Sequence, residues 1–213
     1  MSRGLKAVCA LGAIVGAGWL VHRVGIRSGV SGEEARRQLP GDEVVGDPQW
    51  QSTRAVTIDA SPAEVWPWIV QMGFPGSRAG WYTPYWLDHL VWRTGARSAD
   101  EIIPELQELK LGDEVSDSAD GSVFWTVEAI EAERHLVLRT IRHIIPPIRS
   151  VDSSWSVVLK PVEEGKTRLY LRARAVYTPK WIVPLVEIVI GPADWLNGAA
   201  MLADIRRRAE GRK

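Results

Sequence analysis

Hydrophobic and polar residues alternate with a period of two in several runs of the chain, which is typical of strands. The runs with this pattern are residues 54–59, 122–131, 134–142, 153–160 and 167–177. In the last run, the apolar side chains from Leu169 to Tyr177 share one face, and Arg and Tyr side chains occupy the other. A sheet with one buried and one polar face is typical of antiparallel pairing, so the pattern predicts an antiparallel sheet whose second face meets water.

Two segments have helical periodicity instead. Ser61 and Glu64 have the spacing of a capping box, and Pro62 occupies the first helical position. The apolar positions that follow at i, i+3, i+4 and i+7 are Val65, Trp68, Ile69 and Met72. Residues 179–209 predict a long C-terminal helix, which Pro192 is expected to kink or split. Its first half is apolar on most faces, so it must be buried or must face lipid.

Residues 1–27 predict a membrane anchor. No charged residue occurs from Ala7 to Val21, and residues 5–26 are long enough to reach across a bilayer if Lys6 and Arg23 extend to its surfaces. The predicted partner of this segment is therefore a membrane, and the predicted location is membrane-associated with a single pass.

A cleaved signal peptide is the alternative interpretation of the same segment. The basic start, the apolar run and the small residues Gly16 and Gly18 also fit such a peptide, and the protein would then be secreted. Residues 28–50 are interpreted as a connector, and residues 51–210 as the main domain.

Composition and charge exclude several classes of function. The chain has 213 residues and balances 26 Lys and Arg against 26 Asp and Glu, whereas a general nucleic-acid binder is normally basic. A single cysteine excludes a disulfide scaffold and a multi-thiolate metal site. Eleven Trp against two Phe predict a core or a cavity lined by indole rings.

The sequence contains no convincing catalytic motif. The spacings of metal ligands, phosphate-binding loops, dinucleotide-binding loops and nucleophile elbows are all missing, so neither a metal nor a cofactor is expected. Asp88 and His89 are the one acid–imidazole pair in a predicted cavity wall. Neighbouring residues on a helix point apart, so this pair is not a ready-made dyad.

Several short motifs together resemble the SRPBCC superfamily, also called START-like or polyketide-cyclase-like. The motifs that carry the resemblance are residues 60–73 (ASPAEVWPWIVQMG), 78–82 (RAGWY), 104–107 (PELQ), 112–113 (GD) and 40–43 (PGDE). The loop before Arg78 is longer than this family pattern. The resemblance implies an α+β helix-grip fold, in which a curved antiparallel sheet wraps around the long C-terminal helix and leaves an apolar cavity between them.

The expected ligand is a hydrophobic small molecule or a lipid, held in that cavity. The candidate ligand-binding residues are Trp68, Gln71, Arg78, Tyr82, Trp86, Trp125, Trp155 and Trp195. Arg78 and Gln71 follow the first helix and border the expected mouth, where an Arg could pair with a ligand carboxylate or phosphate. A structural ion pair of Arg78 with Asp113 or Glu105 is the alternative.

Three functions remain open at this point. The first is a membrane-tethered binder of a hydrophobic molecule, with no catalytic residue. The second is a cyclase or dehydratase acting in the same cavity, for which Asp88, His89, Tyr82 and Arg78 are the candidates for acid–base chemistry. The third is an interaction module in which Trp181–Ile190 lies on a membrane or a partner.

Overall fold

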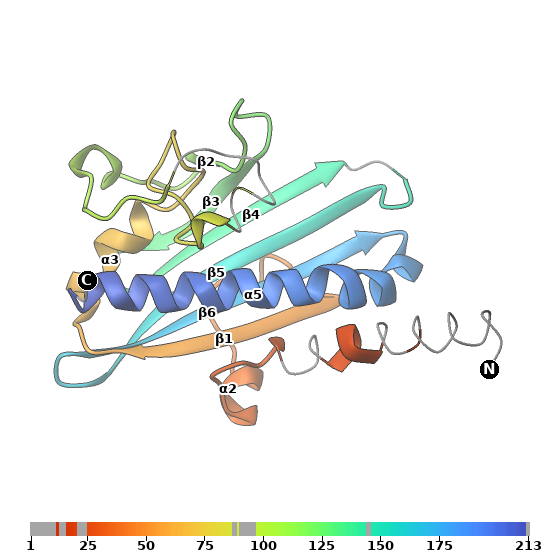
Figure 1. Cartoon of the computed structure of the whole chain (residues 1–213), viewed down its shortest axis with the longest axis horizontal. Helices are drawn as coiled ribbons and strands as arrows, with labels where there is room; N and C mark the ends of the chain where they lie inside the picture. Colours follow the sequence, from red (N-terminus) through yellow and green to blue (C-terminus); the bar gives the residue numbers. More distant parts are fainter. Residues whose placement is uncertain are drawn as a thin grey trace.

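The chain folds as one long helix lying along one face of an open, six-stranded antiparallel sheet (Figure 1). The computed structural model describes residues 12, 16–20, 25–86, 89, 97–143 and 146–211. Strand order across the sheet is β1-β6-β5-β4-β3-β2. The elements are α2 (Gly32–Arg36), β1 (Trp50–Ile58), α3 (Pro62–Val70), η1 (Pro104–Leu106), β2 (Glu114–Ser116), β3 (Phe124–Glu131), β4 (His135–His143), β5 (Ser150–Glu163), β6 (Lys166–Thr178), η2 (Lys180–Ile182) and α5 (Val183–Ala209). The prediction of an α+β fold with an antiparallel sheet and a long C-terminal helix is confirmed.

The inner face of the sheet is built from the apolar positions that the alternation predicted. On β6, Leu169 and Leu171 are buried in one cluster with Met201, Leu202 and Ile205 from the last turns of α5. Ala173, Ala175 and Tyr177 are buried in a second cluster, together with Val186 near the start of α5. The two ends of the helix therefore cover different parts of the same strand.

Helix α3 closes the first of these two clusters. It begins as predicted, because the Ser61 N–H donates a 2.7 Å hydrogen bond to the Glu64 carboxylate. Val65 and Ile69 are fully buried against the sheet and α5. The helix continues through Pro67 without a break.

The outer face of the sheet is not simply solvated, so that expectation is wrong for β6. Arg172 is buried, and its guanidinium donates to the Asp42 carboxylate at 2.6 Å and to the carbonyl oxygens of Ala35 and Arg37. Arg174 lies beside it and pairs with Asp42 at 3.0 Å. Residues 28–49 thus pack on the outer face of the sheet, where their acceptors make burial of two arginines tolerable.

Helix α5 is continuous through Pro192, so the predicted split is wrong. Packing along the sheet holds the two halves in line although Pro192 cannot donate a helical hydrogen bond. Within the described residues, the stretch Lys180–Ala209 is the one helix long and apolar enough to cross a membrane, and it is also the helix that covers the sheet. The predicted N-terminal spanning helix falls mostly outside the described residues, of which residues 16–20 are helical.

Candidate functional site

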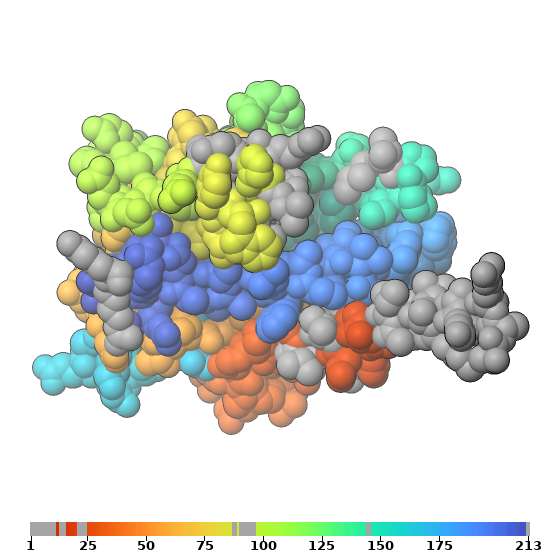
Figure 2. Space-filling view, viewed as in Figure 1, coloured from red at the N-terminus to blue at the C-terminus, as the bar shows by residue number. Residues whose placement is uncertain are grey.

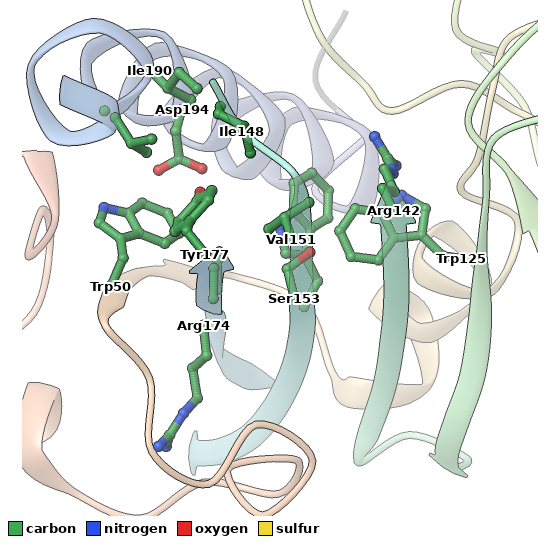
Figure 3. Close-up of a pocket in the computed structure, with 15 residues that line it drawn as sticks. Trp50, Trp125, Arg142, Ile148, Val151, Ser153, Arg174, Tyr177, Ile190 and Asp194 are labelled. Carbon is green, nitrogen blue, oxygen red and sulfur yellow. The ribbon is translucent and has the colours of Figure 1, made fainter. Parts of the chain in front are cut away.

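A cavity of about 250 Å³ lies between the first half of α5 and the inner face of the sheet (Figure 3). Ile190 and Asp194 project into it from α5, while Trp50 and Tyr177 come from the strands opposite. Trp125 and Arg142, from β3 and β4, close its far end. The remaining lining residues are Ile148, Val151, Ser153, Trp155, Ala173, Arg174, Ala175, Val186 and Gly191.

Small side chains leave this space open. Inner positions of β6 carry Leu169 and Leu171 under the last turns of α5, but Ala173 and Ala175 under its first half. Gly191 on the facing side of α5 adds no side chain of its own. The same strand and the same helix therefore enclose a packed core at one end and a hollow at the other.

Aromatic rings form the rigid walls of the cavity. The ring centroids of Trp125 and Trp155 lie 5.0 Å apart, and the two ring planes are tilted by 30°. The Trp81 ring meets the Trp155 ring edge-on, with the two centroids 5.6 Å apart. Trp155 packs against both core clusters, so it stands at the border between the packed end and the hollow end. Large flat rings of this kind favour an apolar or aromatic guest.

The α5 end of the cavity is polar because it holds a buried ion pair. Arg54 is 1% exposed, and its Nη2 lies 2.5 Å from the Asp194 carboxylate. Its other donors reach the Gly25 carbonyl oxygen at 3.1 Å and the Ser52 hydroxyl at 3.2 Å. A Cβ at Gly198 would lie 2.9 Å from the Arg54 Nη1, so only glycine at this position lets α5 pass over the guanidinium without displacing it.

Tyr177 faces this ion pair from the sheet. Its hydroxyl and the Asp194 carboxylate point toward one another in Figure 3. Burial, together with the nearby negative charge of Asp194, raises the pKa of Tyr177 to about 12. The phenol therefore stays neutral at physiological pH and can offer a hydrogen bond to a ligand.

The opposite end of the cavity holds a second Arg–carboxylate pair. Arg142 donates to the Asp117 carboxylate and stacks over the Trp125 ring, 5.3 Å from its centre. Burial raises the pKa of Asp117, while the charge of Arg142 opposes that rise. With both carboxylates paired to arginines, the cavity presents apolar walls and neutral hydrogen-bonding groups rather than a free charge.

Two of the predicted site residues line this cavity, namely Trp125 and Trp155. Trp195 does not: it packs against Gly25, where a Cβ would lie 2.5 Å from its Cγ. Trp86 is 57% exposed on the surface.

Four further predicted residues lie together in the packed end instead. Gln71 is buried, and its amide donates to the Tyr82 hydroxyl at 2.8 Å and accepts from the Ile103 N–H at 2.9 Å. Trp68 meets the Tyr82 ring edge-on at 6.1 Å. Arg78 donates to the carbonyl oxygens at the end of α3, each at 2.6 Å, so it ties the chain to the helix terminus rather than pairing with Asp113 or Glu105.

The residues proposed for acid–base chemistry are not brought together in the cavity. The Tyr82 hydroxyl accepts a hydrogen bond from the Gln71 amide, and the Arg208 guanidinium carbon lies 4.8 Å from the centre of the Tyr82 ring. His89 stacks on Tyr85 at 5.8 Å, and Asp88 lies outside the described residues.

Sequence reasoning missed Arg54, Asp194 and Tyr177 as one group. A usable signal was present, because Arg54 shares one face of its strand with the apolar residues Val56 and Ile58, two and four positions further along. A charge in such a position requires a buried partner. The partner on α5 is 140 positions further along the chain and could not be identified by spacing.

Comparisons with known proteins do not assign the chain to a family. No family model matches it, and no curated protein matches it. Similar solved structures include norcoclaurine synthase from Thalictrum flavum, with 14% identity, a TM-score of 0.45, and coverage of 84% of this chain and 94% of that one. A hypothetical protein from Helicobacter pylori has 15% identity, a TM-score of 0.46, and coverage of 79% and 92%. A protein from Mesorhizobium loti has 15% identity, a TM-score of 0.44, and coverage of 76% and 98%. At these identities no activity is transferred to the chain.

Proposed function

We propose that the chain is a membrane-tethered member of the SRPBCC helix-grip group that binds a hydrophobic small molecule or lipid in the cavity under α5. The observation that carries this proposal is the cavity itself, which is bounded by aromatic and aliphatic side chains and lies against the long helix. Ligand pockets in proteins are typically concave and mostly apolar, with a few polar groups that fix orientation.

The lining favours a ligand with one neutral polar group. At the α5 end a ligand hydroxyl could donate to the Asp194 carboxylate, and a ligand carbonyl could accept from the neutral Tyr177 hydroxyl. An anionic group is disfavoured there, since the charge of Arg54 is already paired with Asp194. Asp194 would repel a second negative charge in this poorly solvated place.

The proposed tether is the apolar segment of residues 5–26. Its support is the uncharged run from Ala7 to Val21 and the exposure of Trp19 and Leu20. An apolar helix with exposed Trp and Leu has a favourable place in a bilayer, where such side chains leave water.

The test is native mass spectrometry of the full chain extracted in mild detergent. We expect the wild type to carry one apolar adduct per chain, and Ala173→Leu to lose it because the new side chain occupies the hollow. Leu111→Ala, at an exposed loop position, is the matched control and should keep the adduct. A wild type without an adduct, or an adduct that persists in Ala173→Leu, contradicts the proposal.

A further inference from the structure

An apolar stripe runs along η2 and the first half of α5 on the side away from the sheet. Trp181, Leu185, Val189 and Ile190 are 67%, 51%, 62% and 44% exposed. The spacing of four between the first three places them on one helical face. Contiguous apolar residues at this exposure are unusual on a soluble monomer and mark an interaction surface.

The stripe borders a groove that lies next to the cavity. A groove of about 320 Å³ runs between α5 and the turn at Pro146 and Pro147, with almost wholly apolar walls. Ile148, Val186 and Ile190 line both this groove and the cavity, so the two spaces are neighbours at these side chains. We expect a ligand larger than the cavity to extend past them toward the groove and the stripe.

Residues 16–20 lie beside the same part of α5 (Figure 2). A Cβ at Gly18 would lie 3.0 Å from the Ile188 carbonyl oxygen, so a glycine allows the two helical segments to approach closely. Trp19 and Leu20 are exposed beside this contact. The apolar surface of α5 is thus continuous with the proposed tether.

Charge at the border of the stripe points to one kind of partner. Lys180 and Arg149 are exposed next to the stripe and the groove, whereas Glu187, on the same stretch of α5, is partly buried. Apolar residues flanked by basic ones are the pattern of surfaces that insert into anionic bilayers. A second copy of the chain would offer the same basic groups across a twofold interface, which is electrostatically unfavourable.

We infer that the first half of α5 and the Pro146–Pro147 turn rest in the surface of a lipid bilayer, so that the cavity opens toward the acyl chains. The bilayer is then the source of the ligand, which enters along the groove without crossing water. This inference rests on the proposed function for the ligand, but the membrane contact itself does not require an occupied cavity.

The experiment places a nitrobenzoxadiazole fluorophore on single cysteines in the full chain. Cys9 is the one native cysteine, so Cys9→Ser gives a clean background. The label is attached at Val189→Cys in one variant and at Val162→Cys in the control, and each protein is reconstituted in vesicles of phosphatidylcholine and phosphatidylglycerol. Val162 is similarly exposed, at 51%, but it lies in the β5–β6 hairpin at the opposite end of the molecule (Figure 1).

We expect nitroxide-labelled lipids to quench the label at position 189 and iodide in the buffer to quench the label at position 162. A label at position 189 that iodide quenches and lipid does not would overturn the inference. Shielding from both quenchers would also overturn it, because protein rather than lipid would then cover the stripe. Leu185→Cys provides an independent second position if the first labelled variant folds poorly.

Failure of this inference is distinguishable from failure of the proposed function. Native mass spectrometry of the same labelled proteins in detergent reports whether the cavity holds a ligand. Lipid quenching at position 189 supports the membrane contact whatever the cavity contains, and an empty cavity counts against the proposed function alone.

Discussion

The two ends of α5 cover the same sheet face but enclose very different interiors. The last turns place Met201, Leu202 and Ile205 against Leu169 and Leu171, and all five side chains are at most 5% exposed. Toward the start of the helix, Val186 and Ile190 face alanines, and a cavity remains. Architecture is shared between the two ends, so side-chain size and an additional covering helix decide which end is solid.

In the part of the chain that the structure describes, the packed end gains a second layer that the hollow end lacks. Helix α3 places Val65, Trp68 and Ile69 beside α5, while the hollow end is bordered by the Pro146–Pro147 turn. At the hollow end a buried ion pair between Arg54 and Asp194 also joins α5 to β1. The comparison suggests that stability and ligand binding are divided between the two ends, and the following predictions test that division.

The largest expected effect comes from breaking the ion pair between Arg54 and Asp194. Arg54→Met removes the positive charge beside the Asp194 carboxylate in a mostly buried place, and we expect a loss of about 3–5 kcal/mol in the free energy of unfolding. Urea denaturation of detergent-solubilised protein measures it. The double variant Arg54→Met with Asp194→Leu should regain most of the loss. A loss below about 1 kcal/mol, typical of exposed pairs, would show that the pair is solvated.

A pair of substitutions on β6 compares the two ends directly. Leu171→Ala creates a cavity in the packed end and should cost about 2–5 kcal/mol of unfolding free energy. Overpacking a filled core usually costs about 1–3 kcal/mol of unfolding free energy. Ala173→Leu should cost less than this, because the new side chain enters existing space.

The same two variants should differ in the opposite sense in binding. A neutral fluorescent naphthylamine probe should bind Leu171→Ala as it binds the wild type and should not bind Ala173→Leu. Equal stability losses in the two variants, or equal binding, would remove the distinction between the ends.

A smaller effect is expected from Tyr177→Phe. Loss of the hydroxyl should weaken binding of apolar ligands that carry a hydroxyl or carbonyl group by about 0.5–1.5 kcal/mol. Binding of pure hydrocarbons should be unchanged, and this serves as the internal control. Calorimetric titration with matched ligands measures the difference, and an equal loss for both ligand types would contradict a polar role for Tyr177.

The smallest expected effect comes from Glu34, which lies on the outer face of the sheet. A change there should leave both ends of the helix–sheet interior unaffected, so it serves as a control. Burial would raise the pKa of Glu34, but hydrogen bonds from the Ser31 N–H and from Tyr170 and Arg168 lower it from 4.5 to about 2. Because the folded-state value is depressed, this contribution to stability is complete above pH 4.5 and is lost as pH falls toward 2.

Glu34→Gln should therefore flatten the acid limb of the stability profile. Urea denaturation at several pH values below neutrality measures this change, and probe binding at neutral pH should stay at the wild-type level. An unchanged acid limb would contradict the assigned hydrogen bonds.

Local patterns predicted the fold but only part of the site. Period-two runs found the five longer strands, and the apolar helix pattern found α3 and the C-terminal helix, because these signals lie within a few residues of one another. The pattern predicted that the arginines of β6 lie on a solvent-exposed face of the sheet. Nothing near them in the sequence shows that Asp42 and the carbonyl groups of residues 35 and 37 cover them.

The site residues were harder to predict because aromatic and polar side chains look alike in sequence at both ends. Trp68, Gln71 and Tyr82 have the composition expected of a cavity wall, yet they pack against one another in the solid end. The hollow depends on Ala173 and Ala175, and small residues in an alternating strand indicate only that the strand is present. Which end stays open depends on the side chains that α5 and α3 place against each part of β6.

Diffraction from crystals of the delipidated chain under xenon pressure tests the central claim most directly, since a dry apolar cavity of about 150 Å³ already binds xenon. A xenon atom should occupy the space between Ala173, Ala175, Val186 and Ile190, and none should appear between Leu171 and Met201. Side chains that fill the first position, or xenon bound only at the second, would contradict the division into a solid and a hollow end.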